Sequence, residues 1–263
     1  MSRGPSGHDA LHVMLLFIGD GRCICLMLSL YLRITSRAMT VAVVPLEYFP
    51  PLHSVALMAA ADRVLWADTW PYRRHTRQSR SKLRNPNGWQ WIALPMWSHQ
   101  HGRPLREVKI DGNVPWHERQ WRAFMYNYRS TMYFEYFEDD FAPLFDTAPE
   151  PLHVVNEATT RCTCSFAQID TPFERASAHG IEALSDVRST LQAEAVWVAH
   201  EHQEELGADA ESEAYTVLAP YEHPTYRQNF DGFEPGMAAI DCLFNYGPEA
   251  TRIMADGLSV PAV

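Results

Sequence analysis

The segment from Gln78 to Met96 constrains the fold of this chain more than any other, because Asn87-Gly88 joins a basic run to an apolar, aromatic run. An Asn-Gly pair between two strand-like runs predicts a β-hairpin, since both residues accept the positive φ of a type I′ turn. The second strand is apolar on both faces, which predicts burial on both sides. Side chains alternate along a strand, so one face of the first strand would carry Gln78, Arg80, Lys82 and Arg84. We expect the basic run before the turn, together with the arginines just ahead of it, to be held against a core, and we call it the basic arm. The alternative is that these cations lie on the solvated face of a helix.

The distribution of charge predicts a small anionic ligand. The formal net charge is -10, which argues against general binding to nucleic acid or to anionic membranes. The stretch from Thr69 to Arg106 nevertheless contains no Asp or Glu and is rich in Lys and Arg. Acidic residues gather in Glu135–Asp140 and Glu201–Glu213. We interpret Glu135–Asp140 as a solvated face, with acid–base chemistry, metal binding or a salt bridge to the basic arm as alternatives.

The N-terminal region differs from the rest of the chain. Its apolar runs, Leu11–Ile18 and Cys23–Leu32, are shorter than the ~20 residues of a spanning helix, so no membrane span is predicted. Ser36 and Ala38 resemble the small residues of a signal-peptide cleavage site. We favour a start at Met39, because the protein would then open directly on a strand.

We expect residues 1–38 to be an extension, residues 39–257 to form the domain, and residues 258–263 to be a tail. The five cysteines do not follow the spacing of a disulfide framework, which favours a reducing, cytoplasmic compartment. The sequence leaves the oligomeric state open.

Hydrophobic periodicity predicts an α/β fold of one domain, with a mixed sheet, the N-terminal hairpin and flanking helices. Strands are expected at Val41–Val44, Arg63–Ala67, Arg106–Ile110 and Tyr215–Leu218. Helices are expected at His53–Ala61, Trp116–Tyr128, Tyr133–Phe145, much of Ile181–Glu205, and a segment with Ala239, Ile240, Leu243 and Phe244. A division into two domains near Thr147 is the alternative.

Motifs for cofactors and metals are weak. Neither a G-x-G-x-x-G, a P-loop nor a G-x-S-x-G is present, so no cofactor is predicted. The pairs His99-x-His101 and Cys162-x-Cys164 lack the further ligands of a zinc site. His202, in the run HEHQEE, lacks a histidine partner at helical spacing. We interpret it as a surface residue and predict no metal site.

Several stretches taken together resemble the WbqC-like protein family of bacteria. In the first half they are Val44-Pro45-x-x-Tyr48-Phe49-Pro50-Pro51, Gln78-x-Arg80-x-Lys82, Asn87-Gly88-Trp89-Gln90-Trp91 and Tyr128-Arg129-Ser130. In the second half they are His223-Pro224-x-Tyr226-x-Gln228 and Ile240-Asp241-x-Leu243-Phe244-Asn245. Many relatives carry a His-Gln pair in the first loop, where this chain has Val44 and Pro45. Any chemistry that this histidine performs in the relatives is therefore absent from this chain or carried out by another residue.

The resemblance implies a role in the assembly of surface polysaccharide of the O-antigen type, with transfer of glycine or another acyl group onto a sugar. For such a transfer His223 is the candidate general base, and Asp241 orients it or is itself the base. Arg80 and Lys82 are candidates to hold a phosphate, for example that of a sugar nucleotide. The other candidate substrate-binding residues are Tyr48, Gln78, Asn87, Tyr226, Gln228 and Asn245.

The remaining cations of the basic arm lie outside the matched positions, and we interpret them as solvated. They are Arg73, Arg74, Arg77 and Arg84. Because the chain carries no standard catalytic signature, the alternative function is a non-catalytic accessory protein that binds a sugar nucleotide or a partner.

Overall fold

Five parallel strands form the central sheet of the computed structural model, which describes residues 39–261 of the 263-residue chain. They are β1 (Thr40–Val44), β2 (Arg63–Trp66), β5 (Phe173–Arg175), β6 (Ala195–Val198) and β7 (Thr216–Val217). The order across the sheet is β5-β2-β1-β6-β7, and each neighbouring pair is parallel. The predicted α/β class is therefore confirmed.

The predictions about the apolar runs and the cleavage site of residues 1–38 lie outside the described residues. The start at Met39 stays a prediction. From Thr40 onward the described residues form one compact unit. Among the helices that the structure describes, none combines the length and apolar character required to cross a membrane.

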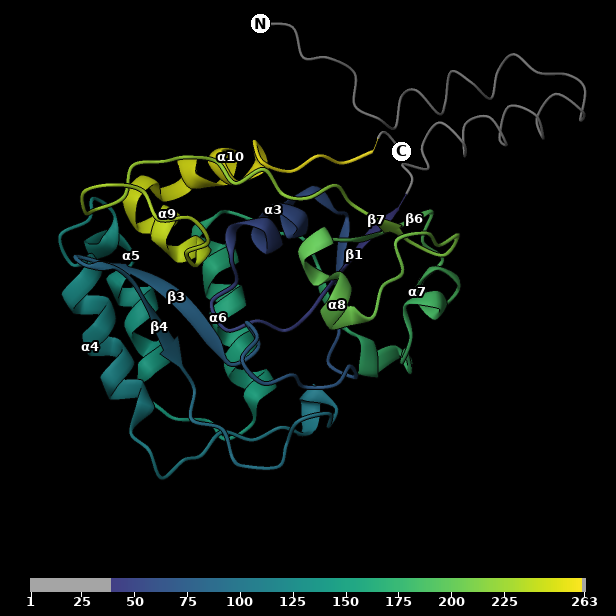
Figure 1. Cartoon of the computed structure of the whole chain (residues 1–263), viewed down its shortest axis with the longest axis horizontal. Helices are drawn as coiled ribbons and strands as arrows, with labels where there is room; N and C mark the ends of the chain where they lie inside the picture. Colours follow the sequence, from purple (N-terminus) through teal and green to yellow (C-terminus); the bar gives the residue numbers. More distant parts are fainter. Residues whose placement is uncertain (1–38, 262–263) are drawn as a thin grey trace, which may run out of the picture. The chain divides into compact units, whose positions relative to one another are not determined.

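The connections of β1 point to a candidate ligand site at the carboxyl end of the sheet. The chain passes from β1 through helix α3 (Leu52–Ala60) to β2 on one side, whereas β6 pairs with the other side of β1 (Figure 1). The strand order thus reverses between β1 and β6. In open α/β sheets the crevice beyond the carboxyl ends of two such strands is the usual ligand site. The loops that follow β1 and β6 are therefore the first place to look for function.

The predicted β-hairpin is confirmed as a separate two-stranded sheet of β3 (Arg80–Asn85) and β4 (Gly88–Ala93). Its predicted type I′ turn is wrong. Asn85 pairs with Gly88, so Pro86 and Asn87 are the central residues, and proline cannot adopt positive φ. Only Gly88 has positive φ at this turn, at 117°.

Burial of β4 on both faces is also wrong. Trp89 and Trp91 are 41% and 36% exposed. Their face of the hairpin is covered in part by its own cations, because Lys82 lies opposite Trp91 in the register and its ammonium lies 4.2 Å from the centroid of the Trp89 ring. The opposite face packs against the core through Leu83 and Ile92.

Helices surround the sheet and hairpin (Figure 1). They are α4 (Trp116–Tyr128), α5 (Phe134–Phe141), α6 (Leu152–Phe166), α7 (Leu184–Leu191), α8 (Gln203–Leu206), α9 (Ala239–Tyr246) and α10 (Ala250–Ala255). An aromatic cluster joins them to the loop after β1: the ring centroid of Phe124 lies 5.0 Å from that of Phe49 and 4.8 Å from that of Phe141.

One predicted strand is wrong, and one segment expected to be helical for much of its length contains a strand. Arg106–Ile110 forms no strand of the sheet, since Leu105–Glu107 is a 3-10 helix and Ile110 makes only an isolated bridge with Met96. The segment Ile181–Glu205 is helical in α7 and at the beginning of α8, but strand β6, which was not predicted, lies between them. Its Ala-Val-Trp-Val run pairs with β1 and is largely buried, so tertiary pairing overrides the helix formers around it.

Candidate functional site

The loop of residues 45–51, which we call the first loop, is held rigidly at the carboxyl end of β1. The buried Asn156 amide of α6 donates to the carbonyl oxygens of Leu46 and Gln78, at 2.8 Å each. This side chain therefore ties the first loop to the basic arm. Ser81 of β3 donates to the Phe49 carbonyl at 2.8 Å, and Phe49 itself has φ 44° and no exposed surface. The many anchors fix the direction in which the loop presents its side chains.

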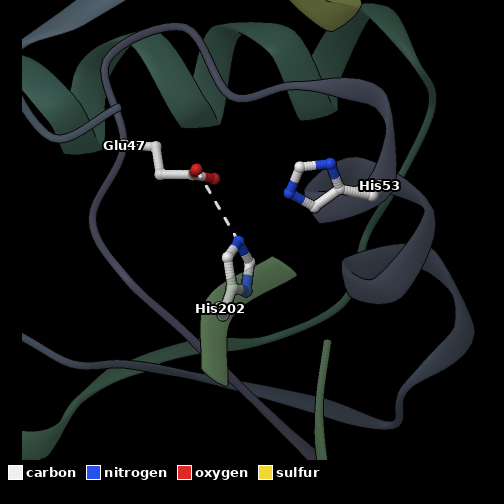
Figure 2. A group of neighbouring side chains, drawn as sticks. All are labelled: Glu47, His53 and His202. Carbon is white, nitrogen blue, oxygen red and sulfur yellow. Dashed lines mark ion pairs between the residues drawn. The ribbon is translucent and has the colours of Figure 1, made fainter. Parts of the chain in front are cut away.

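Glu47, on the first loop, meets His202, which follows β6 in the 3-10 helix His200–His202. The Glu47 Oε1 and His202 Nε2 atoms are 3.6 Å apart, and both side chains are 2% exposed. Ser54 of α3 donates to Glu47 Oε2 at 2.5 Å, and its Oγ lies 3.1 Å from His202 Nε2. Figure 2 shows His53 of α3 facing the same space. The interpretation of His202 as a surface residue is thus wrong.

Opposite charges stabilise each other in this cluster. Burial acts to raise the pKa of the Glu47 carboxyl, but the charge and hydrogen bond of His202 hold it below its ordinary value. Burial acts to lower the pKa of His202, and Glu47 raises it above its ordinary value. Burial and the neighbouring His202 lower the pKa of His53 to about 4. The pairing therefore favours the charged forms of Glu47 and His202, whereas His53 is neutral near pH 7.

A cleft of about 280 Å³ lies beside this cluster and opens to solvent. That volume is close to the lower end of the ~300–1,000 Å³ of small-molecule sites. The cleft is lined by Arg73, His75, Thr76, Arg77, Arg80, Trp91, Glu201, Glu204 and Glu205. One wall is thus cationic, from the basic arm, and the other is acidic, from the segment after β6. Glu47 adjoins the cleft, because its charge acts on both Arg77 and Glu205.

The cationic wall has unused hydrogen-bonding capacity. Arg77 and Arg80 make no ion pair with a carboxylate among the described residues, and their guanidinium carbons lie 5.1 and 4.1 Å from the Trp91 ring centroid. Arg77 Nη2 donates to the Gly236 carbonyl at 2.6 Å. Arg77 Nη1 and Arg80 Nε are buried donors with no acceptor in the described part of the chain. Such groups are uncommon in native proteins, and an anionic ligand would supply acceptors for them.

Glu205 is the group on the acidic wall best suited to proton transfer. Burial, with the nearby charge of Glu47, raises the pKa of the Glu205 carboxyl to about 7, although a hydrogen bond with Gln78 opposes the shift. Its Oε1 atom has no hydrogen-bond partner among residues 39–261. A general acid or base works best with a pKa near the operating pH. By contrast, the exposed Glu204 is paired with Arg73 at 3.3 Å.

The predicted ligand-binding residues of the hairpin fall into different environments. Arg80 lines the cleft. Gln78 is buried and accepts a hydrogen bond from the Arg73 backbone at 2.8 Å, so it supports the wall. Lys82 lies on the Trp89 ring. Asn87 is exposed at the hairpin turn. Their roles in binding stay predictions.

His223 and Asp241 each make internal hydrogen bonds, and neither lines this cleft. His223 Nδ1 contacts the Pro224 carbonyl at 2.9 Å, and Nε2 accepts from the Gly236 backbone at 3.0 Å. Asp241 is completely buried and accepts from the Tyr226 hydroxyl at 2.7 Å and the Gln228 amide at 3.2 Å. Burial raises the pKa of Asp241 to about 6, against these hydrogen bonds. Their catalytic roles stay predictions.

Two further candidates also have internal partners. The buried Tyr48 hydroxyl donates to Gln120 of α4, and the Asn245 amide donates to the Asp241 backbone carbonyl at 2.7 Å within α9. Three cations that we interpreted as solvated are corrected. Arg84 is 2% exposed, and both Arg77 and Arg73 are half-buried in the cleft wall.

Sequence reasoning missed Glu47, His53, His202 and Glu205. Glu47 lies in the Pro-rich first loop, His53 follows that loop, and His202 and Glu205 lie within seven residues after the Ala-Val-Trp-Val run. Recognition of that run as a strand would have placed polar residues at the ends of two parallel strands. This is the signal that could have found them.

The fold and site define an α/β protein with a polar cleft where the strand order reverses. The chain belongs to the WbqC-like protein family, whose model matches residues 46–253. It is also 27% identical over 220 residues to the uncharacterized protein Rv1507c of Mycobacterium tuberculosis, covering 80% of this chain and 95% of that protein. No solved structure matches the chain.

Proposed function

We propose that this protein is a transferase that moves an aminoacyl group such as glycine, activated on a phosphate, onto a sugar during surface-polysaccharide assembly. The glycan context comes from the family resemblance. The observation that carries the proposal is the polarised cleft, in which Arg77 and Arg80 face Glu201 and Glu205. A phosphoryl leaving group suits the arginines, because guanidinium groups bind phosphate by paired hydrogen bonds. The amino group of an aminoacyl donor suits the carboxylate of Glu201.

In the transfer, an oxygen or nitrogen of the sugar attacks the acyl carbon, and the bond from that carbon to the phosphate oxygen breaks. Glu205 takes the proton of the attacking group, and the phosphate leaves as an anion held by the arginines. The half-buried position of Glu205 and its unpartnered oxygen support this role. His223 then acts as a positioning residue, since its Nε2 accepts from the Gly236 backbone and the Gly236 carbonyl accepts from Arg77. Asp241 acts through Tyr226, which donates to its carboxylate and stacks on the His223 ring.

Ligand binding and turnover can be tested separately. The full chain is screened by thermal shift against nucleotide sugars, inorganic pyrophosphate and a non-hydrolysable aminoacyl-adenylate analogue. A true ligand at a hundredfold excess over its dissociation constant adds roughly 2.7 kcal/mol of stability. We expect Arg80→Ala to abolish this shift. Arg74→Ala is the matched control, because Arg74 is an exposed arginine of the same arm outside the cleft lining.

Mass spectrometry of a sugar acceptor then measures transfer. We expect Glu205→Gln to retain ligand binding and to lose transfer by ~10²–10⁴-fold, the range for general acid–base catalysis. Equal behaviour of the Arg80 and Arg74 variants would reject the cleft as the site. Ligand binding by the wild-type protein without transfer would instead favour the non-catalytic accessory function.

A further inference from the structure

Three potential metal ligands converge beside the cleft. One donor atom each from Glu47, His53 and His202 lies within 4.8 Å of the other two. Figure 2 shows the three side chains, which come from the first loop, α3 and the segment after β6, turned toward a common space. Within residues 39–261 no other group of three His, Cys, Asp or Glu meets this condition. We propose that Glu47, His53 and His202 bind one divalent transition-metal ion. This inference rests on the proposed function, because it specifies how the same site activates its acceptor.

The separations of the donors fit a compact ion. In a tetrahedral zinc site with metal–ligand distances of about 2.1 Å, neighbouring ligand atoms are about 3.4 Å apart. The Glu47 Oε1 to His202 Nε2 distance of 3.6 Å is already close to this value. His53 lies in the first turn of α3 and is only half-buried, so a side-chain rotation can bring its ring to the same point.

The chemistry of the donor set selects the class of metal. Two imidazoles and one carboxylate, with a fourth position left for water or substrate, are the ligands of one class of catalytic zinc sites. Imidazole nitrogen suits zinc and other late first-row ions, whereas magnesium and calcium require oxygen ligands. A transition-metal ion is therefore the class that this site fits.

The surroundings hold the carboxylate ligand in place. Ser54 donates to Glu47 Oε2, which leaves Oε1, the atom nearer to His202, for the metal. The Thr160 hydroxyl of α6 contacts the Glu47 backbone carbonyl at 3.4 Å. Partners of this kind orient ligands, and their loss commonly weakens metal affinity by ~10–100-fold.

The position of the ion would link it to the proposed transfer. When bound, a divalent ion supplies Lewis acidity that makes a coordinated hydroxyl easier to deprotonate. Glu205 is near enough to Glu47 for their charges to interact, so its carboxylate can accept the proton released. The ion is then held by His53, Glu47 and His202, and the cationic wall holds the aminoacyl donor.

The test uses the full chain after treatment with a chelator. Zn²⁺ binding is measured by isothermal titration calorimetry, and Co²⁺ is added separately, because its visible absorption reports four-coordination by nitrogen and oxygen. We expect one Zn²⁺ per chain and a loss of affinity of at least tenfold in His53→Ala and in His202→Ala. His53→Ala is the safer variant for folding, since His53 is the least buried of the three ligands.

His200→Ala is the matched control, because His200 is exposed in the same 3-10 helix as His202, and it should bind Zn²⁺ as the wild type does. Folding of each variant is checked by circular dichroism. No binding of Zn²⁺ or Co²⁺ by the wild type, or equal affinity in folded His53→Ala and wild type, would overturn the metal site. Arg80→Ala separates the two proposals, since it should still bind Zn²⁺ while losing the anionic ligand.

Discussion

The Glu47 carboxylate and the His202 imidazole form a buried pair across the ends of two neighbouring parallel strands. Their side chains are 2% exposed, with 3.6 Å between Oε1 and Nε2, and the register that pairs β1 with β6 brings their loops together. The pair therefore couples the first loop to the segment that carries Glu205. Its energetic role can be measured on the chelator-treated protein, apart from any ligand.

We expect His202→Ala to lower the free energy of unfolding by about 3–5 kcal/mol, because it leaves the Glu47 carboxylate buried without its counter-charge. The double variant Glu47→Leu/His202→Leu should lower the free energy of unfolding by less than His202→Ala does. Urea denaturation of the two variants measures this difference. His200→Ala should unfold like the wild type, and strictly additive single effects of Glu47→Leu and His202→Leu would contradict a coupled pair.

Asn156 is expected to control both the stability and the geometry of the site. Its amide donates to the buried carbonyls of Leu46 and Gln78, so Asn156→Ala leaves two acceptors unsatisfied, at about 1–3 kcal/mol each. Denaturant unfolding should show this loss, and anion binding to the cleft should weaken because the first loop and basic arm are no longer tied. Asn113→Ala is the control, since Asn113 is exposed and its side chain contacts only Asp111. A thermal stability equal to that of the control would reject the role.

The structure predicts a pH dependence that centres on Asp241. Its carboxyl faces Tyr226, Tyr128 and Arg84, and burial raises its pKa from 3.8 to about 6. The folded state thus holds this proton more tightly than the unfolded state does. The stabilisation is full below pH 3.8 and is lost as the pH rises through about 6. The total is on the order of 3 kcal/mol, at 1.36 kcal/mol per pKa unit.

Asp241→Asn removes this titration. The free energy of unfolding of both proteins is measured from pH 4 to pH 7.5. The wild type should lose stability relative to the variant as the pH rises through this range. A constant difference would show that Asp241 does not titrate as inferred. If Asp241 were the catalytic base instead, the variant would lose transfer at every pH, which separates the two roles.

The elements with local signals could be predicted from the sequence. The all-apolar run of β1, the helical stripe of α4 and the paired runs of the hairpin each carry their own periodicity. Strand β6 could not be predicted in this way, because its four strand-like residues lie among the Ala, Gln, Glu and Leu of a helix-forming segment. Its identity depends on pairing with β1, which is distant in the chain.

The candidate site was difficult to predict for the same reason. Arg80 could be selected from the absence of acids around it, but the juxtaposition of Glu47 with His202 requires the crossover that places β6 beside β1. His223 and Asp241 stood out as polar residues in apolar surroundings. The structure gives both of them internal hydrogen bonds, and no local pattern distinguishes a polar group that serves a network from one that serves a ligand.

Trp91 should matter for ligand binding more than for stability. Its ring is 36% exposed and lies beneath the guanidinium groups of Arg77 and Arg80. Exposed cation–π contacts contribute ~0.5–1 kcal/mol each, so Trp91→Ala should lower stability only slightly. It should reduce anion affinity about tenfold, because Arg80 loses the surface that orients it. Calorimetry with the ligand found by thermal shift measures this, and Trp97→Ala, which removes a ring 45% exposed elsewhere, should bind normally.

Arg84 links the hairpin to the segment that follows His223 through hydrogen bonds. We expect that a lysine at this position cannot take over that role. Its Nε donates to the Gln228 side chain at 3.0 Å, and its terminal nitrogens donate to the carbonyls of Asn85, Gly88 and Asp231. A lysine offers one ammonium on a flexible stem and cannot reproduce this planar set of donors.

Arg84→Lys would therefore remove the donor from one buried acceptor, the Gln228 side chain, and from three partly buried carbonyls, at about 1–3 kcal/mol for each buried acceptor that is left unsatisfied. We expect Arg84→Lys to destabilise the protein by about 3 kcal/mol, whereas Arg74→Lys, on the exposed part of the basic arm, stays within ~0.5 kcal/mol of the wild type. Hydrogen exchange should show faster opening of the hairpin amides in the Arg84 variant. Unchanged protection of β3 and β4 would mean that the hairpin is held by its core face alone.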